Sequence, residues 1–227
     1  MPGPVRVLAV SDEVDDALLA DMSPARGAEL ILACGDLPME YLGRLMNRLD
    51  VPLAFVPGNH DPNLSGYRLS QAGLTLRASM PVRSPWPDGA LNADGRVLDL
   101  AGLRIAGLGG CLRYSDGPNQ YTEWQQARRA RALRARARWR RIRDGRAVDV
   151  LITHAPPRGS GDADDPPHRG FAALHGLVAA LRPAALLHGH VRPVAGRPKP
   201  GRLGSTTVCN VTGWRLLRIG PGYLDAC

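Results

Sequence analysis

The chain has 227 residues, of which 44% are hydrophobic and 22% charged, and its formal net charge is +8 at pH 7. These values exclude fibrous, disordered and disulfide-dense proteins, and they allow one sizeable core. We therefore expect a single domain over residues 1–227. No apolar run approaches the roughly 18–20 residues of a membrane span, and segment 5–10 is too short for a signal peptide. We expect a cytoplasmic protein without membrane contact.

The first third of the chain predicts alternating strands and helices. Strands are expected at residues 5–10, 30–33 and 53–56, and helices at 15–22 and 38–49. This order is typical of parallel strand pairing. Pro38 suits the first turn of a helix, which places Asp36 in the turn before it, where open sheets bind ligands.

The middle of the chain changes character. Residues 97–100 and 103–108, separated by Ala101 and Gly102, predict an antiparallel hairpin and hence a second sheet. Residues 123–143, rich in Ala, Arg and Gln, predict a long helix. We expect its buried stripe to consist of Trp124, Ala132, Ala135, Trp139 and Ile142.

The last third predicts a strand at 148–153, a helix at 170–181 and a strand at 185–187. Residues 206–211 and 214–219 predict two further strands, and the break at Thr212-Gly213 between them suggests a second hairpin. Residues 192–202 are expected to form a loop. The four cysteines are far apart and show no zinc-site spacing, so we expect reduced thiols without assigned chemistry; they are Cys34, Cys111, Cys209 and Cys227.

Polar clusters follow five of the predicted strands. These clusters are Ser11-Asp12-Glu13, Gly35-Asp36, Gly58-Asn59-His60-Asp61, Thr153-His154 and His188-Gly189-His190. In this order they resemble the calcineurin-like metallophosphoesterase superfamily, over a region from Asp12 to Arg192. Three segments resemble a bacterial branch of phosphoesterases. They are Ser11-Asp12-Glu13-Val14, Cys34-Gly35-Asp36-Leu37-Pro38 and His168-Arg169-Gly170-Phe171. The resemblance implies an α/β fold with two mixed β-sheets packed face to face and helices outside, an αββα sandwich.

The resemblance also implies a metal site. One metal would be held by Asp36, Asn59, His154 and His190. Two imidazoles, one carboxylate and one amide oxygen suit a borderline divalent ion such as manganese, iron or zinc.

A second metal would normally use Asp12, the shared Asp36 and two further histidines, and here the sequence departs from the family. Val14 stands in place of one histidine and Arg192 in place of the other, and neither side chain can ligate a cation. We expect one tight metal, with the second site weak or absent.

Other residues could take over these positions. Glu13, Asp15, Asp16 and His188 are candidates, and His188 is favoured because residues two apart on a strand share a face. Arg192 could instead pair with Asp12 and offer donors to a phosphate oxygen, or it could block the site.

The implied reaction is hydrolysis of a small phosphodiester or phosphomonoester, nucleotides included, by metal-activated water. His60 would protonate the leaving oxygen. Asp61 would orient His60 or cap the following turn, and Asp12 could be a helix cap rather than a ligand. Further candidates for substrate binding are Arg113, His168, His188 and Arg192.

Two other functions stay open at this stage. The altered positions would permit a metal-containing binding or regulatory protein with little or no turnover. A nuclease using the arginine helix is a second alternative, but a charge run on a helix is usually a solvated face, so nucleic acid is not the favoured partner.

Overall fold

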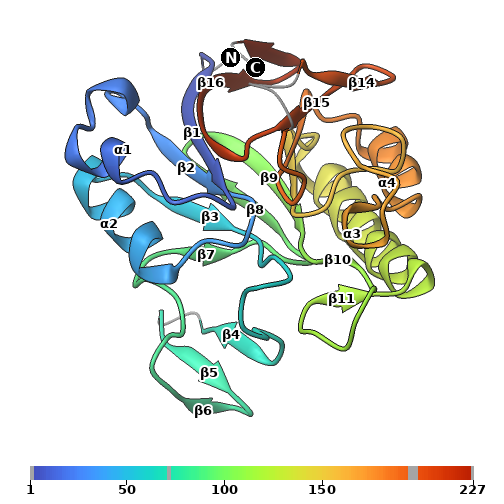
Figure 1. The fold of residues 1–227 in the computed structure, drawn as a ribbon, viewed down its shortest axis with the longest axis horizontal. Coiled ribbons are helices and arrows are strands. Elements are labelled where there is room, and N and C mark those ends of the chain that lie inside the picture. Colours follow the sequence, from blue (N-terminus) through green and yellow to red (C-terminus); the bar gives the residue numbers. More distant parts are fainter. Residues whose placement is uncertain (1–2, 71–72, 194–198, 226–227) are drawn as a thin grey trace.

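Two mixed six-stranded sheets lie face to face, and helices cover their outer surfaces (Figure 1). The computed structural model describes residues 3–70, 73–193 and 199–225. The strand order is β17-β16-β1-β2-β3-β7 in the first sheet and β14-β15-β13-β12-β9-β8 in the second. This is the α/β sandwich expected from the sequence.

The elements of the sandwich have the following bounds. The first sheet contains β1 (Val5–Ser11), β2 (Leu30–Ala33), β3 (Leu53–Phe55), β7 (Leu91–Asn92), β16 (Gly213–Gly220) and β17 (Tyr223–Asp225). The second contains β8 (Val97–Leu100), β9 (Leu103–Leu108), β12 (Val150–Thr153), β13 (Ala185–His188), β14 (Gly201–Leu203) and β15 (Thr206–Asn210). The helices are α1 (Asp16–Ala20), α2 (Met39–Leu49), α3 (Glu123–Asp144) and α4 (Ala173–Leu181).

Shorter elements lie between these. They are the 3-10 turns η1 (Ser23–Ala25) and η2 (Pro166–His168), the strand pair β10 (Cys111–Leu112) and β11 (Gln120–Tyr121), and the small sheet β4 (Tyr67–Leu69), β5 (Thr75–Arg77) and β6 (Met80–Pro81). No helix in the described ranges has the length and apolar character needed to cross a membrane.

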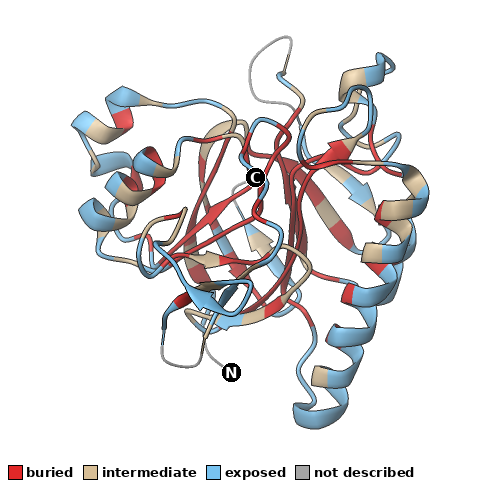
Figure 2. Ribbon diagram, turned by 90° about the horizontal axis from the view of Figure 1, so that it is seen from below, coloured by how far each residue is buried: buried red, intermediate tan, exposed pale blue. Residues whose placement is uncertain are grey.

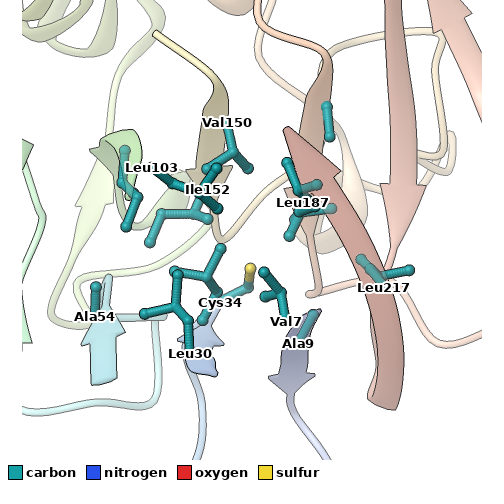
Figure 3. Packing of buried hydrophobic residues seen from close by; sticks show 14 of the residues in the cluster. Val7, Ala9, Leu30, Cys34, Ala54, Leu103, Val150, Ile152, Leu187 and Leu217 are labelled. Carbon is teal, nitrogen blue, oxygen red and sulfur yellow. The ribbon is translucent and has the colours of Figure 1, made fainter. Parts of the chain in front are cut away.

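The alternation of side chains along the strands builds three apolar layers. On β1, Val7 and Ala9 point into the space between the sheets, whereas Leu8 and Val10 point outward toward the layer that includes α1 and α2. Figure 3 shows the central layer, with Val7 and Leu30 on one side and Ile152 on the other. A third layer joins the second sheet to α3 and α4. In Figure 2 the buried residues gather on the strands, and the helices expose their outer faces.

The parallel strands decide where a site can form. Strands β1, β2 and β3 pair in parallel, as the alternation of strands and helices predicts, and β9, β12, β13 and β15 do the same in the second sheet. Their carboxyl ends lie at one end of the sandwich, where loops can bring side chains from both sheets together.

The prediction of which α3 residues are buried is wrong. Trp124, Trp139 and Ile142 are 66%, 60% and 74% exposed, and the buried residues are Gln126, Ala130, Leu133 and Ala137. The periodicity identifies the helix correctly, but it does not decide which of two faces meets the sheet. The helix packs through its smaller side chains and turns both indoles outward.

Three other expectations are also corrected. The hairpin Ala101-Gly102 is present between β8 and β9, but β15 and β16 do not pair with each other. β15 belongs to the second sheet and β16 to the first, so the chain crosses between the sheets at residues 211–212.

Cys209 is disulfide-bonded, whereas Cys34 and Cys111 are free thiols. The expected loop 192–202 lies partly outside the described residues, and its end forms β14.

Candidate metal site

Five polar segments meet at one end of the sandwich, after the carboxyl ends of β1, β2, β3, β12 and β13. Four of them line a pocket of about 720 Å³, and the fifth, Thr153-His154, is buried. Its lining includes Asp12, Asp36, Asn59, His60, Tyr114, Ala163, Asp165, Pro167, His168, His190, Val191 and Arg192. The pocket is therefore built by segments from both sheets.

The backbone turns sharply at three of these strand ends. Asp12, Asp36 and His190 have φ values of 61°, 57° and 69°, a left-handed conformation that is uncommon outside glycine. Such strain is typical of functional sites, because surrounding contacts must hold it in place. Gly58 is also required, since a Cβ there would lie 2.0 Å from Asp36 Oδ1.

Four side chains form what we call the closed half of the site. Asp36, Asn59 and His190 line the pocket, and the fully buried His154 contacts Asp36 and Asn59. His154 Nε2 lies 2.9 Å from Asn59 Oδ1 and 3.2 Å from Asp36 Oδ2. Asp36, His154 and His190 each offer one ligand atom, and these atoms lie within 4.8 Å of one another. The group could hold a metal ion.

Hydrogen bonds to backbone carbonyls fix the orientation of both imidazoles. His154 Nδ1 contacts the carbonyl of Cys34 at 2.8 Å, and His190 Nε2 contacts the carbonyl of Pro167 at 2.7 Å. A carbonyl only accepts, so each of these ring nitrogens carries the proton. The opposite nitrogens, Nε2 of His154 and Nδ1 of His190, are left to serve as metal ligands, a common arrangement around protein metals.

The electrostatics of the closed half favour a cation. Burial lowers the pKa of His154, but the hydrogen bond and charge of Asp36 outweigh it and raise the pKa to about 9. Burial, followed by the charge of His154, lowers the pKa of His190 to about 3, so this ring is neutral, as a ligand must be. Burial raises the pKa of Asp36, yet His154 outweighs this and the pKa ends below its usual value. With a pKa of about 9, His154 is protonated at neutral pH, and it would have to lose the Nε2 proton to act as a metal ligand.

The loop that carries Asn59 and His60 is held from two sides. Asp61 Oδ2 accepts hydrogen bonds from the backbone N–H groups of Gly58, at 2.7 Å, and Asp36, at 2.9 Å. Asn119 Nδ2 donates to the carbonyls of Gly58 and Asp61. Asp61 thus fixes the loop, which differs from the expected bond to the His60 ring and from the expected helix cap.

What we call the open half consists of Asp12 and Arg192, which also line the pocket, and Val14, which is not among the lining residues. Asp12 accepts two hydrogen bonds from the backbone N–H of His190, and burial raises its pKa. Val14 is 46% exposed. The Arg192 side chain is 76% exposed and lies 3.6 Å from Glu13, so it does not form the expected pair with Asp12. The helix cap proposed for Asp12 is instead Asp15, which accepts from Leu18.

His188 does not fill the gap in the open half. It is buried with Nδ1 3.0 Å from the carbonyl of Gly189, and it is absent from the three-residue metal group. The expectation that His188 and His190 share a face differs from the structure because β13 ends at His188 and His190 is left-handed. Burial lowers the pKa of His188 to about 4. Asp15 binds Trp214, so it is also occupied elsewhere.

The remaining candidates divide between the pocket and the surface. His60 and His168 line the pocket, and His168 Nδ1 lies 2.6 Å from Asp165 Oδ2. The ring of His168 lies 5.5 Å from that of His190. Arg113 is exposed, donates to the carbonyl of Gln120, and is not part of the pocket lining.

The sequence did not predict the supporting roles of three residues, although Tyr114 was a candidate for binding a phosphate or a base. Tyr114 Oη accepts a hydrogen bond from Asn59 Nδ2 at 3.2 Å, which turns Asn59 Oδ1 toward His154. Pro167 supplies the carbonyl that orients His190, and Asn119 holds the Asn59 loop. Tyr114 and Asn119 belong to a loop with ordinary turn composition. A backbone carbonyl is present in every residue, so the sequence cannot indicate which one orients a side chain. Only the polar clusters at the strand ends could be recognised from the sequence.

Comparison with known proteins adds a family and a fold. The profile of calcineurin-like phosphoesterases matches residues 11–191. A search of curated proteins found no match. The solved structure of TT1561 from Thermus thermophilus is similar over 99% of this chain and 98% of its own, with 20% identity and a TM-score of 0.65.

A second solved structure, a candidate 5′-nucleotidase from Staphylococcus aureus in complex with alpha-ketoglutarate, is similar over 99% of this chain with 13% identity and a TM-score of 0.50. This chain spans 53% of that protein. At these identities the two structures establish the likeness of fold.

Proposed function

The chain belongs to the calcineurin-like phosphoesterase family, and from this premise we propose that it is a phosphoesterase that depends on one tightly held divalent metal ion. The observation that carries the proposal is the convergence of Asp36, Asn59 and His154, with His190 beside them. Ligand atoms about 2.1 Å from one ion lie about 3.0–3.4 Å apart, close to the spacing around His154 Nε2. The donor set fits manganese, iron or zinc.

The residues of the closed half would hold the ion, and their partners would keep them in place. Cys34 and Pro167 orient the two imidazoles, and Tyr114 orients Asn59. A bound divalent ion supplies Lewis-acid polarisation of a phosphoryl oxygen and makes a water molecule more acidic. The open half lacks two imidazoles, so we propose no second tight ion.

His60 is the proposed general acid. Its side chain is exposed and lines the pocket, while its backbone N–H donates to Asp36 Oδ1 at 2.8 Å, which places it directly beside the closed half. A proton passes from His60 to the leaving oxygen as the phosphorus–oxygen bond breaks. Asp61 contributes by holding the His60 loop. His168, paired with Asp165, faces the same pocket and is proposed to contact the phosphate.

The substrate class follows from the pocket. Its volume of about 720 Å³ suits a small phosphodiester or phosphomonoester. Nucleotides fit this size, and the fold likeness to a candidate 5′-nucleotidase makes them reasonable first compounds to test.

The experiment combines metal counting with hydrolysis of bis(p-nitrophenyl) phosphate and p-nitrophenyl phosphate by the wild type and by His60→Ala. We expect about one ion per chain in both proteins, and loss of activity after chelation. His60→Ala should lower kcat by about 10²–10⁴-fold, because that is the usual contribution of a general acid. Rapid hydrolysis by thoroughly chelated protein would contradict the proposal.

One observation favours a second candidate function, a metal-containing binding or regulatory protein. Val14 and Arg192 leave the open half without two of its ligands and exposed to solvent. If wild type and His60→Ala both hold one ion and are equally inert toward every ester tested, this function replaces the phosphoesterase.

A further inference from the structure

The outward face of α3 carries an unneutralised positive charge. The helix contains nine arginines and two acidic residues. The acidic groups near it are used on its inner side, where Arg129 pairs with Asp94 and Arg140 with Asp99. Arg136 donates to the carbonyl of Gly95. Within the described residues, the other six arginines of the helix are exposed and form no ion pair: Arg128, Arg131, Arg134, Arg138, Arg141 and Arg143.

Large apolar side chains lie among these arginines. Trp124 and Trp139 are 66% and 60% exposed. Arg128 lies over the Trp124 ring at 5.6 Å, and Arg143 lies over the Trp139 ring at 5.1 Å. Exposed indoles are costly to leave in water, and here they are combined with cations that form no ion pair.

The helical period brings these residues together. Steps of three or four residues connect Trp124, Arg128, Arg131, Ala135, Arg138 and Ile142 into one stripe, opposite the buried Ala130 and Leu133. Figure 2 shows the outer side of this long helix as exposed along most of its length. The two tryptophans are 15 positions apart, which is about 22 Å along the helix axis.

We propose that this face of α3 binds single-stranded nucleic acid. Guanidinium groups contact successive phosphates, and the two indoles offer flat surfaces on which unpaired bases stack. A separation of about 22 Å agrees with the site size of roughly 4–16 nucleotides for sequence-tolerant single-strand binders. The binding is independent of the metal pocket, so it does not rest on the proposed phosphoesterase activity.

The stripe fits other occupants less well. A membrane-bound helix presents a continuous apolar face to the bilayer, whereas here arginines interrupt the apolar residues at every turn. A double helix would use the arginines but leave the indoles without bases to stack on. Unpaired bases and phosphates together use both kinds of side chain.

The test measures fluorescence anisotropy of a labelled 20-nucleotide oligodeoxythymidine with the full chain in EDTA, which prevents metal-dependent cleavage. Binding should weaken steeply between 50 and 200 mM salt. The variant Arg128→Gln/Arg131→Gln/Arg138→Gln should bind at least about tenfold more weakly and lower the slope of log affinity against log salt by about 2, since each single-strand phosphate contact contributes roughly 0.7.

A matched control removes the same charge elsewhere. Arg26→Gln/Arg44→Gln/Arg48→Gln alters three exposed arginines in and before α2, on the opposite side of the sandwich. This variant should bind within about twofold of the wild type. Equal weakening of both triple variants would overturn the proposal, because net charge alone would then explain the binding.

The indoles are tested separately. Trp139→Ala should weaken binding at least about fivefold without changing the salt slope, because stacking carries no counterion release. Circular dichroism checks that the helix is intact. Affinity for a 20-base-pair duplex equal to that for the single strand would overturn the assignment, as would tighter binding to phosphatidylserine vesicles than to the oligonucleotide.

Discussion

The closed and open halves of the site both follow the carboxyl ends of strands, but they differ in how firmly their side chains are held. In the closed half, each donor side chain is fixed by a contact with another segment, such as the carbonyl of Cys34 for His154 or that of Pro167 for His190. In the open half, Asp12 is held by the backbone, but Val14 and Arg192 face solvent. The comparison shows that the proposed metal ligands of the closed half are oriented by several segments, whereas the open half offers a single oriented carboxylate, that of Asp12.

The largest effect is expected from removing a donor of the closed half. His154→Ala should lower metal affinity by more than about 100-fold, because the loss of an outer partner alone costs about 10- to 100-fold. Metal content after dialysis against a chelator measures this. His190→Ala serves as a second variant in case the fully buried His154 is needed for folding. His175→Ala, on the exposed surface of α4, should leave the metal content unchanged.

The difference between the two halves should disappear when the two missing histidines are introduced into the open half. Val14→His combined with Arg192→His should raise the metal content from about one ion to about two per chain, since these are the two positions where the open half lacks an imidazole, and Arg192 lines the same pocket as Asp12. Val14→Ala with Arg192→Ala is the control. A content that stays at one would show that these two side chains do not explain the difference between the halves.

A smaller effect is expected from an orienting contact. Tyr114→Phe removes the hydroxyl that accepts from Asn59 Nδ2, so metal affinity should fall by about tenfold. Calorimetric titration with manganese measures it. Tyr67→Phe, which loses a hydroxyl bonded to Arg77 in the small sheet, should titrate as the wild type does. Unchanged affinity in Tyr114→Phe would mean that Asn59 needs no outside support.

The smallest effect is expected at Arg192. Its ion pair with Glu13 is long and exposed, so Arg192→Ala should change the free energy of unfolding by less than about 1 kcal/mol. Arg104→Ala provides the contrast in the same urea titration, because Arg104 is buried between Asp99 and Asp144 and its loss should cost about 3 kcal/mol or more. A large effect at Arg192 would assign it a structural role that its exposure does not indicate.

Much of the fold could be predicted because its signals are local. The strands at β1, β2 and β12 and the Ala101-Gly102 hairpin follow from apolar runs and turn residues. The helix α3 was predicted correctly in extent, but its buried face was not. The predicted buried residues, which include Trp124 and Trp139, follow the helical period. Only the packing of Ala130 and Leu133 against the sheet shows that this face points outward.

The site divides in the same way. Side chains such as Asp36 and His190 could be selected because each follows a strand whose end is readable in the sequence. The supporting roles of Tyr114, Asn119 and Pro167 could not be predicted, because each role depends on a contact with a group far away in the sequence. One hypothesis paired Arg192 with Asp12, but the side chain lies near Glu13, since sequence position does not determine the direction of a long exposed side chain.

The sequence by itself determined the alternation of strands and helices, the polar residues at the strand ends, and the absence of imidazoles at positions 14 and 192. Only the tertiary structure decided which face of α3 is buried, that β15 and β16 join different sheets, and which carbonyls orient His154 and His190. The physical reason is that hydrophobic period and residue chemistry are properties of neighbouring residues, which the sequence shows directly. Packing and hydrogen-bond partners depend instead on contacts between residues far apart in the chain.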